Sequence, residues 1–274
     1  MENKNMNFKL NQKSEQDKKI EENLNKIKNK LMVLSGKGGV GKSTISVNIA
    51  AYLAKEGYKV GLMDVDLHGP NTLKMLGLED KRLYSDGKNL IPLEYSENLK
   101  VISIASLLET PETPVIWRGP LKIGVIKQFL ADVVWGELDW LVIDTPPGSG
   151  DEPLTVAQLI KDALVVIVTT PQEVSLLDIR KSISFSKQLG LKIAGLIENM
   201  SGLICPYCGK KIEIFKSGTS ENVAKKMEIP YLGAIPMAKE IVDMSDEGKP
   251  YFVEVTDSEP VKEFKKIMEK IINK

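Results

Sequence analysis

The stretch Gly36-Lys37-Gly38-Gly39-Val40-Gly41-Lys42-Ser43-Thr44 decides how the rest of this 274-residue sequence is interpreted. It follows the apolar run Leu31-Met32-Val33-Leu34, which is typical of a buried strand. It precedes residues 45–54, whose apolar side chains recur at helical spacing. The stretch therefore completes the pattern G-x-x-x-x-G-K-[ST] between a strand and a helix, which is the context that this phosphate-binding motif requires.

The chemistry of the loop follows from its residue types. Glycines allow backbone N–H groups to turn toward phosphate oxygens, and the helix that begins near Gly41 adds the positive end of its dipole. We expect Lys42 to reach the β- and γ-phosphates of ATP and Ser43 to ligate Mg²⁺. We predict that the whole loop contacts the nucleotide: Gly36, Lys37, Gly38, Gly39, Val40, Gly41, Lys42, Ser43 and Thr44.

Lys37 is a second lysine inside the loop, which an ordinary loop of this kind does not need. The pattern K-G-G-x-G-K-[ST] resembles the deviant Walker A motif of the MinD/ParA and nitrogenase-iron-protein ATPases. The resemblance implies that Lys37 crosses a dimer interface to touch phosphates held by the other subunit, and that ATP binding is coupled to dimer geometry. The alternative is a solvated loop lysine.

Composition limits the class of protein. The 37 basic and 37 acidic residues give no net charge, so no global field recruits nucleic acid or an anionic membrane. The sequence has neither an apolar run of membrane-spanning length nor a secretory signal, and two cysteines do not make a disulfide framework. We therefore expect a cytoplasmic protein with neither a nucleic-acid nor a membrane partner.

The order of apolar runs predicts the fold. Residues 1–30 are rich in lysine, glutamate and asparagine and are expected to form a flexible or helical tail, while residues 31–274 form a single ATPase domain. Strands are expected at 31–34, 59–63, 99–105, 139–143, 163–168, 193–197 and 231–235, and helices at 119–131, 173–189, 219–228 and 260–272. This alternation predicts an α/β fold: a doubly wound, mostly parallel sheet between two helical layers, of the P-loop NTPase type. Ligands of such sheets bind at the carboxyl ends of the strands.

Carboxylates follow two of the expected strands. Asp64 and Asp66 come after the second strand, and Asp144 ends the fourth, so both positions favour a metal- or water-handling site. Turn-forming or capping aspartates are the alternative. By resemblance to the deviant Walker group, Asp66 positions the attacking water, while Asp64 and Asp144 hold Mg²⁺ through water. Gly148 could donate its N–H to the γ-phosphate, as a switch II glycine does. The catalytic work is thus assigned to Lys37, Lys42, Asp66 and Asp144.

Two further residues are assigned to the base of the nucleotide through the same resemblance. Asn199, at the expected end of the sixth strand, corresponds to an asparagine that hydrogen-bonds the adenine edge. Pro236, after the seventh strand, corresponds to the other wall of the base pocket. Asn199 as a simple turn residue is the alternative.

Cys205 and Cys208 form a C-x-x-C pair that can present two thiolates to one metal. Two sulfurs complete neither a tetrahedral zinc site nor a four-iron cluster, because each wants four ligands. Three interpretations stay open: a local disulfide or redox dithiol, zinc bridged by two chains, or a [4Fe-4S] cluster bridged by two chains. The last two require the same symmetric dimer that Lys37 implies.

Taken together, the motifs resemble the Mrp/ApbC family of iron–sulfur cluster carrier ATPases. They are V-L-S-G-K-G-G-V-G-K-S-T, D-V-D-L-H-G-P-N, W-R-G-P, D-T-P-P-G-S-G-D, E-N-M-S and C-P-Y-C. The resemblance implies a homodimer with slow ATP turnover that holds a labile [4Fe-4S] cluster and hands it to apo iron–sulfur client proteins. The amino-terminal cysteine cluster of eukaryotic cytosolic members is missing. Rival functions are a positioning or partitioning ATPase, whose membrane helix would be residues 260–274, and a zinc or other metal-insertion chaperone.

Overall fold

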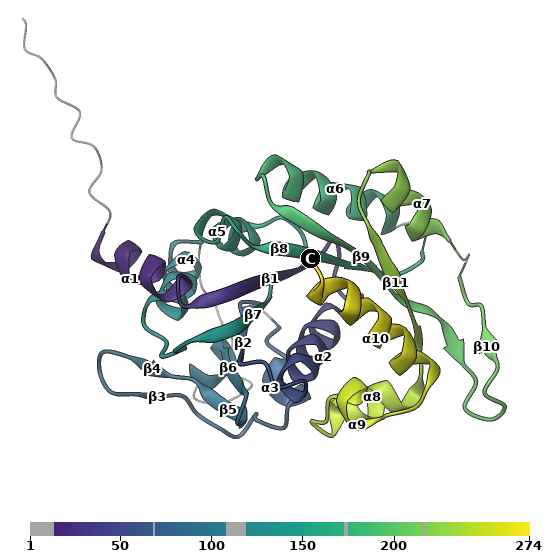
Figure 1. The fold of residues 1–274 in the computed structure, drawn as a ribbon, viewed down its shortest axis with the longest axis horizontal. Helices are drawn as coiled ribbons and strands as arrows, with labels where there is room; N and C mark the ends of the chain where they lie inside the picture. Colours follow the sequence, from purple (N-terminus) through teal and green to yellow (C-terminus); the bar gives the residue numbers. More distant parts are fainter. Residues whose placement is uncertain (1–13, 68, 108–118, 173–174, 216–217) are drawn as a thin grey trace, which may run out of the picture.

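A mostly parallel sheet forms the centre of the computed structural model, which describes residues 14–67, 69–107, 119–172, 175–215 and 218–274 (Figure 1). Within these residues, nine strands join in the order β10-β9-β8-β1-β7-β2-β6-β5, with β11 paired to β9. Their bounds are β1 Ile27–Ser35, β2 Val60–Asp64, β5 Leu93–Ser96, β6 Leu99–Ser103, β7 Leu138–Asp144, β8 Leu164–Thr169, β9 Lys192–Ile204, β10 Lys211–Ile212 and β11 Tyr231–Met237. Only β5 and β10 run antiparallel to their neighbours in this sheet. The expected fold class is confirmed.

Helices cover both faces of the sheet, as the expected three-layer arrangement requires (Figure 1). Their bounds are α1 Glu15–Leu24, α2 Lys42–Lys55, α3 Thr72–Met75, α4 Gly119–Ala131, α5 Asp151–Leu159, α6 Ser175–Gln188, α7 Thr219–Lys226, α8 Lys239–Asp246, α9 Tyr251–Glu254 and α10 Glu259–Ile272. The 3-10 helix η1 spans Ile104–Leu107, and a separate two-stranded sheet pairs β3 Tyr84–Ser85 with β4 Leu90–Ile91.

Alternate residues of each central strand pack against the helical layers on opposite faces of the sheet, because successive side chains in a strand point to opposite faces. In β1, Leu31 and Val33 pack into the cluster that contains α2, α9 and α10. Met32 and Leu34 pack into the cluster that contains α1, α4, α5, α6 and α7. All four side chains are at most 1% exposed, which explains the continuous apolar run that marks this strand in the sequence.

Both ends of the described chain pack onto the domain. β1 begins at Ile27, four residues before the expected boundary at Leu31, because Ile27 already pairs with Leu138 of β7. Lys30 is buried there and forms an ion pair of 2.7 Å with Asp162. Ile20 of α1 is 3% exposed. At the other end, α10 buries its apolar stripe in the core, so the segment considered for a membrane contact is a packed helix. Among the described residues, no helix is long and apolar enough to cross a bilayer.

The sixth expected strand is longer than predicted. The expectation ended it at residue 197, before Glu198-Asn199-Met200-Ser201, but β9 continues to Ile204. Pairing with β11 (Asn199 with Ile235) and with β10 (Ile204 with Lys211) overrides the turn-like composition of this segment. Three residues of the quoted motifs, His68, Trp117 and Arg118, lie outside the described residues.

Candidate nucleotide and metal sites

The phosphate-binding loop joins the end of β1 to the start of α2, at the carboxyl edge of the sheet. Gly39 and Gly41 have φ angles of +77° and +80°, a conformation that side chains rarely adopt. A Cβ at Gly41 would also lie 2.3 Å from Asn199 Nδ2. Gly41 caps α2, so the free N–H groups of the first helical turn face the loop. This geometry is what a phosphate cradle requires.

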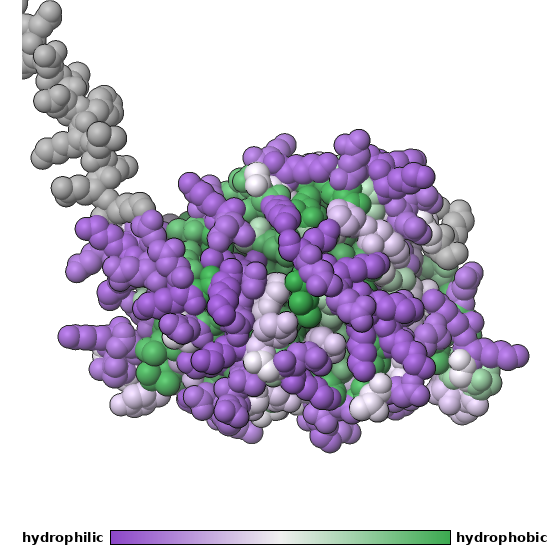
Figure 2. Space-filling model, in the orientation of Figure 1, coloured by the Kyte–Doolittle hydropathy of each residue, from purple (hydrophilic) through white to green (hydrophobic). Residues whose placement is uncertain are grey.

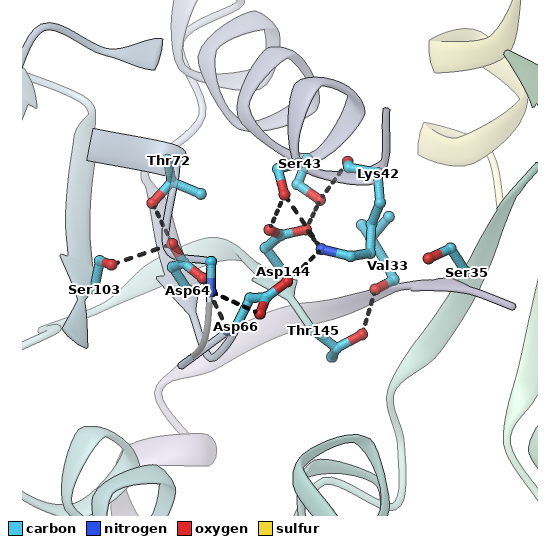
Figure 3. Close-up of polar contacts among 12 residues, drawn as sticks. Val33, Ser35, Lys42, Ser43, Asp64, Asp66, Thr72, Ser103, Asp144 and Thr145 are labelled. Atoms are coloured by element: carbon cyan, nitrogen blue, oxygen red, sulfur yellow. Dashed lines mark hydrogen bonds and ion pairs between the residues drawn. The ribbon is translucent and has the colours of Figure 1, made fainter. Parts of the chain in front are cut away.

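Lys42 and Ser43 of this loop converge on Asp144 at the end of β7 (Figure 3). Lys42 Nζ lies 2.9 Å from Asp144 Oδ1, and Ser43 Oγ donates to Asp144 Oδ2 at 2.6 Å. Ser46 Oγ also donates to Asp144 Oδ1, at 2.7 Å. Asp144 is completely buried, so this carboxylate is held by one cation and two hydroxyls in a low-dielectric setting.

Asp64 lies in the neighbouring strand position, paired in register with Asp144. It accepts hydrogen bonds from Thr72 Oγ1 at 2.7 Å, from Ser103 Oγ at 3.1 Å and from the N–H of Asp66 at 3.0 Å (Figure 3). Complete burial, and then the charge of Asp144, raise the pKa of Asp64 to about 7, although the hydrogen bonds from Thr72 and Asp66 and the charge of Lys42 oppose the rise. Asp64 therefore lies behind the site as a carboxyl close to protonation at neutral pH.

Asp66 lies closer to the opening of the site. Its Oδ2 is 3.7 Å from Lys42 Nζ, and its side chain is 13% exposed. Asp66 lines a cavity of about 380 Å³ together with the phosphate-binding loop, Asn71, Met75 and Pro147. The oxygens of Ser43, Asp66 and Asp144 thus surround one ammonium group at the floor of this cavity. Hard oxygen donors of this kind fit Mg²⁺, so the residues present are compatible with the expected metal.

Gly148 is tied directly to the phosphate-binding loop. Its N–H donates to the carbonyl of Ser35 at 2.8 Å, and its φ angle is +88°. The hydroxyl of Ser35 in turn donates to the carbonyl of Lys37 at 3.0 Å. The segment after β7 is therefore linked to the loop by main-chain contacts, as a segment that responds to phosphate should be.

A second cavity, of about 350 Å³, opens beside the first and shares Gly41, Thr44, Met75 and Met200 with it. Asn199 and Pro236 both line it, as the sequence predicts for a base pocket. Asn199 Nδ2 donates to the carbonyl of Val40 at 2.9 Å, which leaves its Oδ1 to accept a hydrogen bond from a ligand. The remaining walls are mostly apolar, and they include Leu203, Ile241 and Phe252.

Lys37 points across its own loop. Its Nζ donates to Gln172 Oε1 at 2.7 Å, and both side chains are half-buried. Gln172 follows β8 in the chain and belongs to none of the motifs used in the sequence interpretation. The predicted role of Lys37 in a partner subunit stays a prediction.

Cys205 and Cys208 lie at the tip of the β9–β10 hairpin. The N–H of Cys205 donates to the carbonyl of Lys210, and its carbonyl accepts the N–H of Gly209, both at 2.9 Å. Hydrogen bonds from the backbone of Tyr207 and Cys208 lower the pKa of the Cys205 thiol. Cys208 is exposed, and Tyr207 is 97% exposed. Figure 2 shows apolar side chains among polar ones over this end of the molecule, where Ile212 and Ile214 are each 48% exposed.

The two thiols do not form part of a larger ligand set within one chain. No group of three or more His, Cys, Asp or Glu side chains in the described residues is arranged to hold a metal ion. Cys205 lies six residues beyond Asn199, directly after β9 ends at Ile204, so one strand connects the base pocket to the thiols.

Sequence reasoning missed several residues of the nucleotide site. Ser46 lies one helical turn after Lys42 and could have been found from that spacing. Ser103 ends β6, beside β2, so the strand-end rule could have found it. Thr72 begins α3 and Gln172 follows β8, and because the course of both segments depends on tertiary packing, no local signal marks these two residues.

A phosphate-binding loop after a central parallel strand, with an aspartate ending the adjacent strand, defines a P-loop nucleoside triphosphatase. Residues 26–272 match the ParA family, described as NUBPL iron-transfer P-loop NTPase, and the chain belongs to this family.

Relatives support the same assignment. An iron-sulfur cluster carrier protein of Methanocaldococcus jannaschii is 51% identical over 262 residues, covering 95% of this chain and 90% of the relative. A cytosolic Fe-S cluster assembly factor NUBP2 homolog of Dictyostelium discoideum is 47% identical, covering 90% of this chain and 95% of the relative.

Solved structures share the fold. A nucleotide-binding protein of Archaeoglobus fulgidus, in complex with ADP and with Co, aligns with a TM-score of 0.78 and 38% identity, covering 90% of this chain and 96% of that chain. The cell division ATPase MinD of Pyrococcus furiosus aligns with a TM-score of 0.63 and 24% identity, covering 89% and 98% of the two chains. The likeness to MinD shows the fold alone.

Proposed function

We propose that this protein is an ATP-hydrolysing iron–sulfur cluster carrier that holds a labile [4Fe-4S] cluster between two copies and transfers it to apo-proteins. The observation that carries the proposal is a cysteine pair, half-buried Cys205 and exposed Cys208, at the tip of a hairpin whose strand β9 also lines the nucleotide pocket. Relatives named iron-sulfur cluster carrier protein support it. So does the name of a cytosolic assembly factor among them, which favours the cytosol as its location.

The cysteine geometry suits a cargo better than a permanent cofactor. Backbone N–H groups aimed at Cys205 stabilise its thiolate, while exposed Cys208 is open to exchange with an incoming thiol. Two copies meeting at this hairpin supply the four thiolates that a [4Fe-4S] cluster wants. A client protein can then approach the cluster from the solvent side.

The nucleotide site supports ATP hydrolysis. Bound Mg²⁺ would neutralise phosphate charge, with Ser43 as a direct ligand and with Asp144 and Asp64 acting through water. Lys42 lies where it can turn from Asp144 to the phosphates, and Asp66, at the opening, orients the attacking water. The N–H of Gly148 lies where it can leave Ser35 for the γ-phosphate. Slow intrinsic turnover is expected from the resemblance to the carrier ATPases.

Strand β9 offers a route from nucleotide to thiols. Met200 lines both cavities and has a φ angle of +58°, which is uncommon for a residue with a side chain. Leu203 lines the base pocket two residues before Cys205, and it pairs with Ile212 of β10. A base that fills the pocket would therefore contact β9, the strand that leads into the cysteine hairpin.

The test is anaerobic reconstitution with iron and sulfide, followed by elemental analysis and ultraviolet–visible spectra. A bridged [4Fe-4S] cluster gives about two iron and two sulfide per chain. Cys205→Ala and Cys208→Ala should each lose this iron, while Tyr207→Ala, a matched control in the same turn, should keep it. Variants that bind as much iron as the parent would overturn the proposal.

The same analysis separates the rival functions. About half a zinc per chain, lost in the cysteine variants, would indicate zinc bridged by two chains. Nickel or molybdenum in anaerobically purified protein would indicate a metal-insertion chaperone. Sedimentation with liposomes that depends on ATP would indicate a positioning ATPase, although the apolar stripe of α10 is packed in the core.

A further inference from the structure

The contact between Lys37 and Gln172 places the second lysine of the loop over its own nucleotide site. Lys37 Nζ donates to Gln172 Oε1 at 2.7 Å, and Lys37 lines the phosphate cavity of its own chain. A lysine that serves a partner subunit must leave this position. The strength of the contact therefore enters the free energy of dimer formation.

Close packing fixes the two backbones that carry this contact. A Cβ at Gly36 would lie 2.6 Å from backbone atoms of Asp178, in the first turns of α6. Asp178 of α6 therefore lies directly against the start of the phosphate-binding loop. Pro171, the residue before Gln172, accepts a hydrogen bond at its carbonyl from Thr219 Oγ1 at 2.9 Å, so the backbone that carries the amide is tied to α7.

The contact is also linked to the segment that follows β7. Gly148 N–H donates to the carbonyl of Ser35 at 2.8 Å, and Ser35 Oγ donates to the carbonyl of Lys37 at 3.0 Å. When the N–H of Gly148 turns to a γ-phosphate, the first of these bonds breaks. The backbone of Lys37 then loses part of its support, while its side chain is still held by Gln172.

We propose that Gln172 is a positioning residue that holds Lys37 in its own subunit until a nucleotide-loaded second copy accepts the lysine. The inference rests on the dimer of the proposed function. A neutral amide oxygen suits this role because its hydrogen bond to an ammonium is weaker than the bond that a phosphate offers. The lysine is thus kept in place in the single subunit and is given up when the partner's phosphates are within reach.

Two substitutions of Gln172 change the strength of its contact with Lys37 in opposite directions. Gln172→Glu replaces the neutral acceptor by a carboxylate, so the dissociation constant of the dimer should rise on the order of tenfold. Gln172→Ala removes the acceptor, so that constant should fall by roughly twofold to fivefold. Analytical ultracentrifugation with Mg²⁺ and a non-hydrolysable ATP analogue measures both. With ATP, Gln172→Glu should lower kcat at fixed protein concentration and leave KM for ATP nearly unchanged.

Two controls separate positioning from a general structural effect. Gln188→Glu makes the same chemical change at an exposed position of α6 and should leave dimerisation unchanged. In the Lys37→Ala background, which itself loses the nucleotide-driven dimer, both Gln172 substitutions should leave the melting temperature of the nucleotide-free protein unchanged, because no side chain remains to be held.

Two results would overturn the inference. One is an equal effect of the Gln172 substitutions with and without Lys37, which would make Gln172 structural. The other is a parent protein that stays monomeric with the analogue. A monomeric parent would also contradict the nucleotide-driven dimer of the proposed function. The iron analysis would still test cluster binding independently.

Discussion

The ammonium of Lys42 contacts two carboxylates, with its Nζ 2.9 Å from Asp144 Oδ1 and 3.7 Å from Asp66 Oδ2. The convergence of Lys42, Asp66 and Asp144 was predictable because each follows a strand that ends at the same edge of the sheet. The inward position of Asp64 was not, because Thr72 and Ser103 hold it there from separate segments.

Asp64 should make stability depend on pH. Its folded-state pKa of about 7 exceeds the ordinary value of 3.8. Between these two pH values, the carboxyl of Asp64 keeps its proton in the folded chain and loses it in the unfolded chain. The free energy of unfolding should therefore fall as pH rises from about 4 to about 7. The free energy of unfolding of Asp64→Asn should equal that of the parent near pH 4 and exceed it by roughly 2–4 kcal/mol at pH 8.

Urea unfolding with EDTA and without nucleotide measures this difference. Asp80→Asn, an exposed control, should show none of it. A constant difference between Asp64→Asn and the parent across this pH range would contradict the raised pKa.

Asn199 should contribute to base selection. Asn199→Ala removes the oxygen that faces the base pocket, so the dissociation constant of ATP should rise about tenfold and that of GTP much less. Isothermal titration with each nucleotide measures the ratio, with Asn222→Ala on the exposed side of α7 as control. Equal losses for both nucleotides would mean that Asn199 only supports the loop through Val40.

Strand β9 is the element on which the two sites meet, and it is also where sequence reasoning was wrong. Its first half is apolar and was predicted, whereas residues 198–204 mix polar and apolar side chains with Gly202, and the expected strand ended before them. Pairing with β10 and β11 decides its conformation, and such pairing leaves no local pattern. The same applies to the two-residue strands β3 and β4, which were not predicted.

Gly202 should be needed for the hairpin that carries the cysteines. Its φ angle is +150°, and a Cβ there would lie 2.9 Å from Lys211 Cε and 3.0 Å from the Ile212 carbonyl oxygen. Gly202→Ala should therefore lower stability by about 1–3 kcal/mol and reduce reconstituted iron several-fold, with ATP affinity within about twofold of the parent.

The control for this substitution is Gly87→Ala, which has a φ angle of +88° but nothing near its Cβ position. It carries the same kind of backbone strain without touching the hairpin, so its iron content should equal that of the parent. Equal iron in both variants would show that the hairpin tolerates the change.

At the scale of the molecule, the sequence predicted the layers because buried parallel strands leave continuous apolar runs. It could not predict how far the ends pack, since α1 and the first residues of β1 are rich in lysine. Lys28 and Lys30 are accommodated by ion pairs to Asp139 and Asp162, partners more than a hundred residues away. Composition alone therefore predicts a tail for such a segment.

A nucleotide that drives dimer formation should make thermal stability depend on protein concentration. A non-hydrolysable ATP analogue at a hundred times its dissociation constant stabilises the fold by about 2.7 kcal/mol through binding alone. In the parent, the melting temperature should rise further with protein concentration. Lys37→Ala should keep the stabilisation by the analogue and lose the further rise with protein concentration. Differential scanning fluorimetry at several protein concentrations measures both. A concentration dependence that survives in Lys37→Ala would contradict a trans role.

The ammonium of Lys42, caught between Asp66 and Asp144, has one further consequence. Once the lysine turns to a phosphate, two carboxylates close to each other lose their counter-charge in a dry part of the protein. A divalent cation restores that charge, so nucleotide and cation should each raise the affinity for the other by the same factor. Free ATP in a chelating buffer should accordingly be a poor ligand.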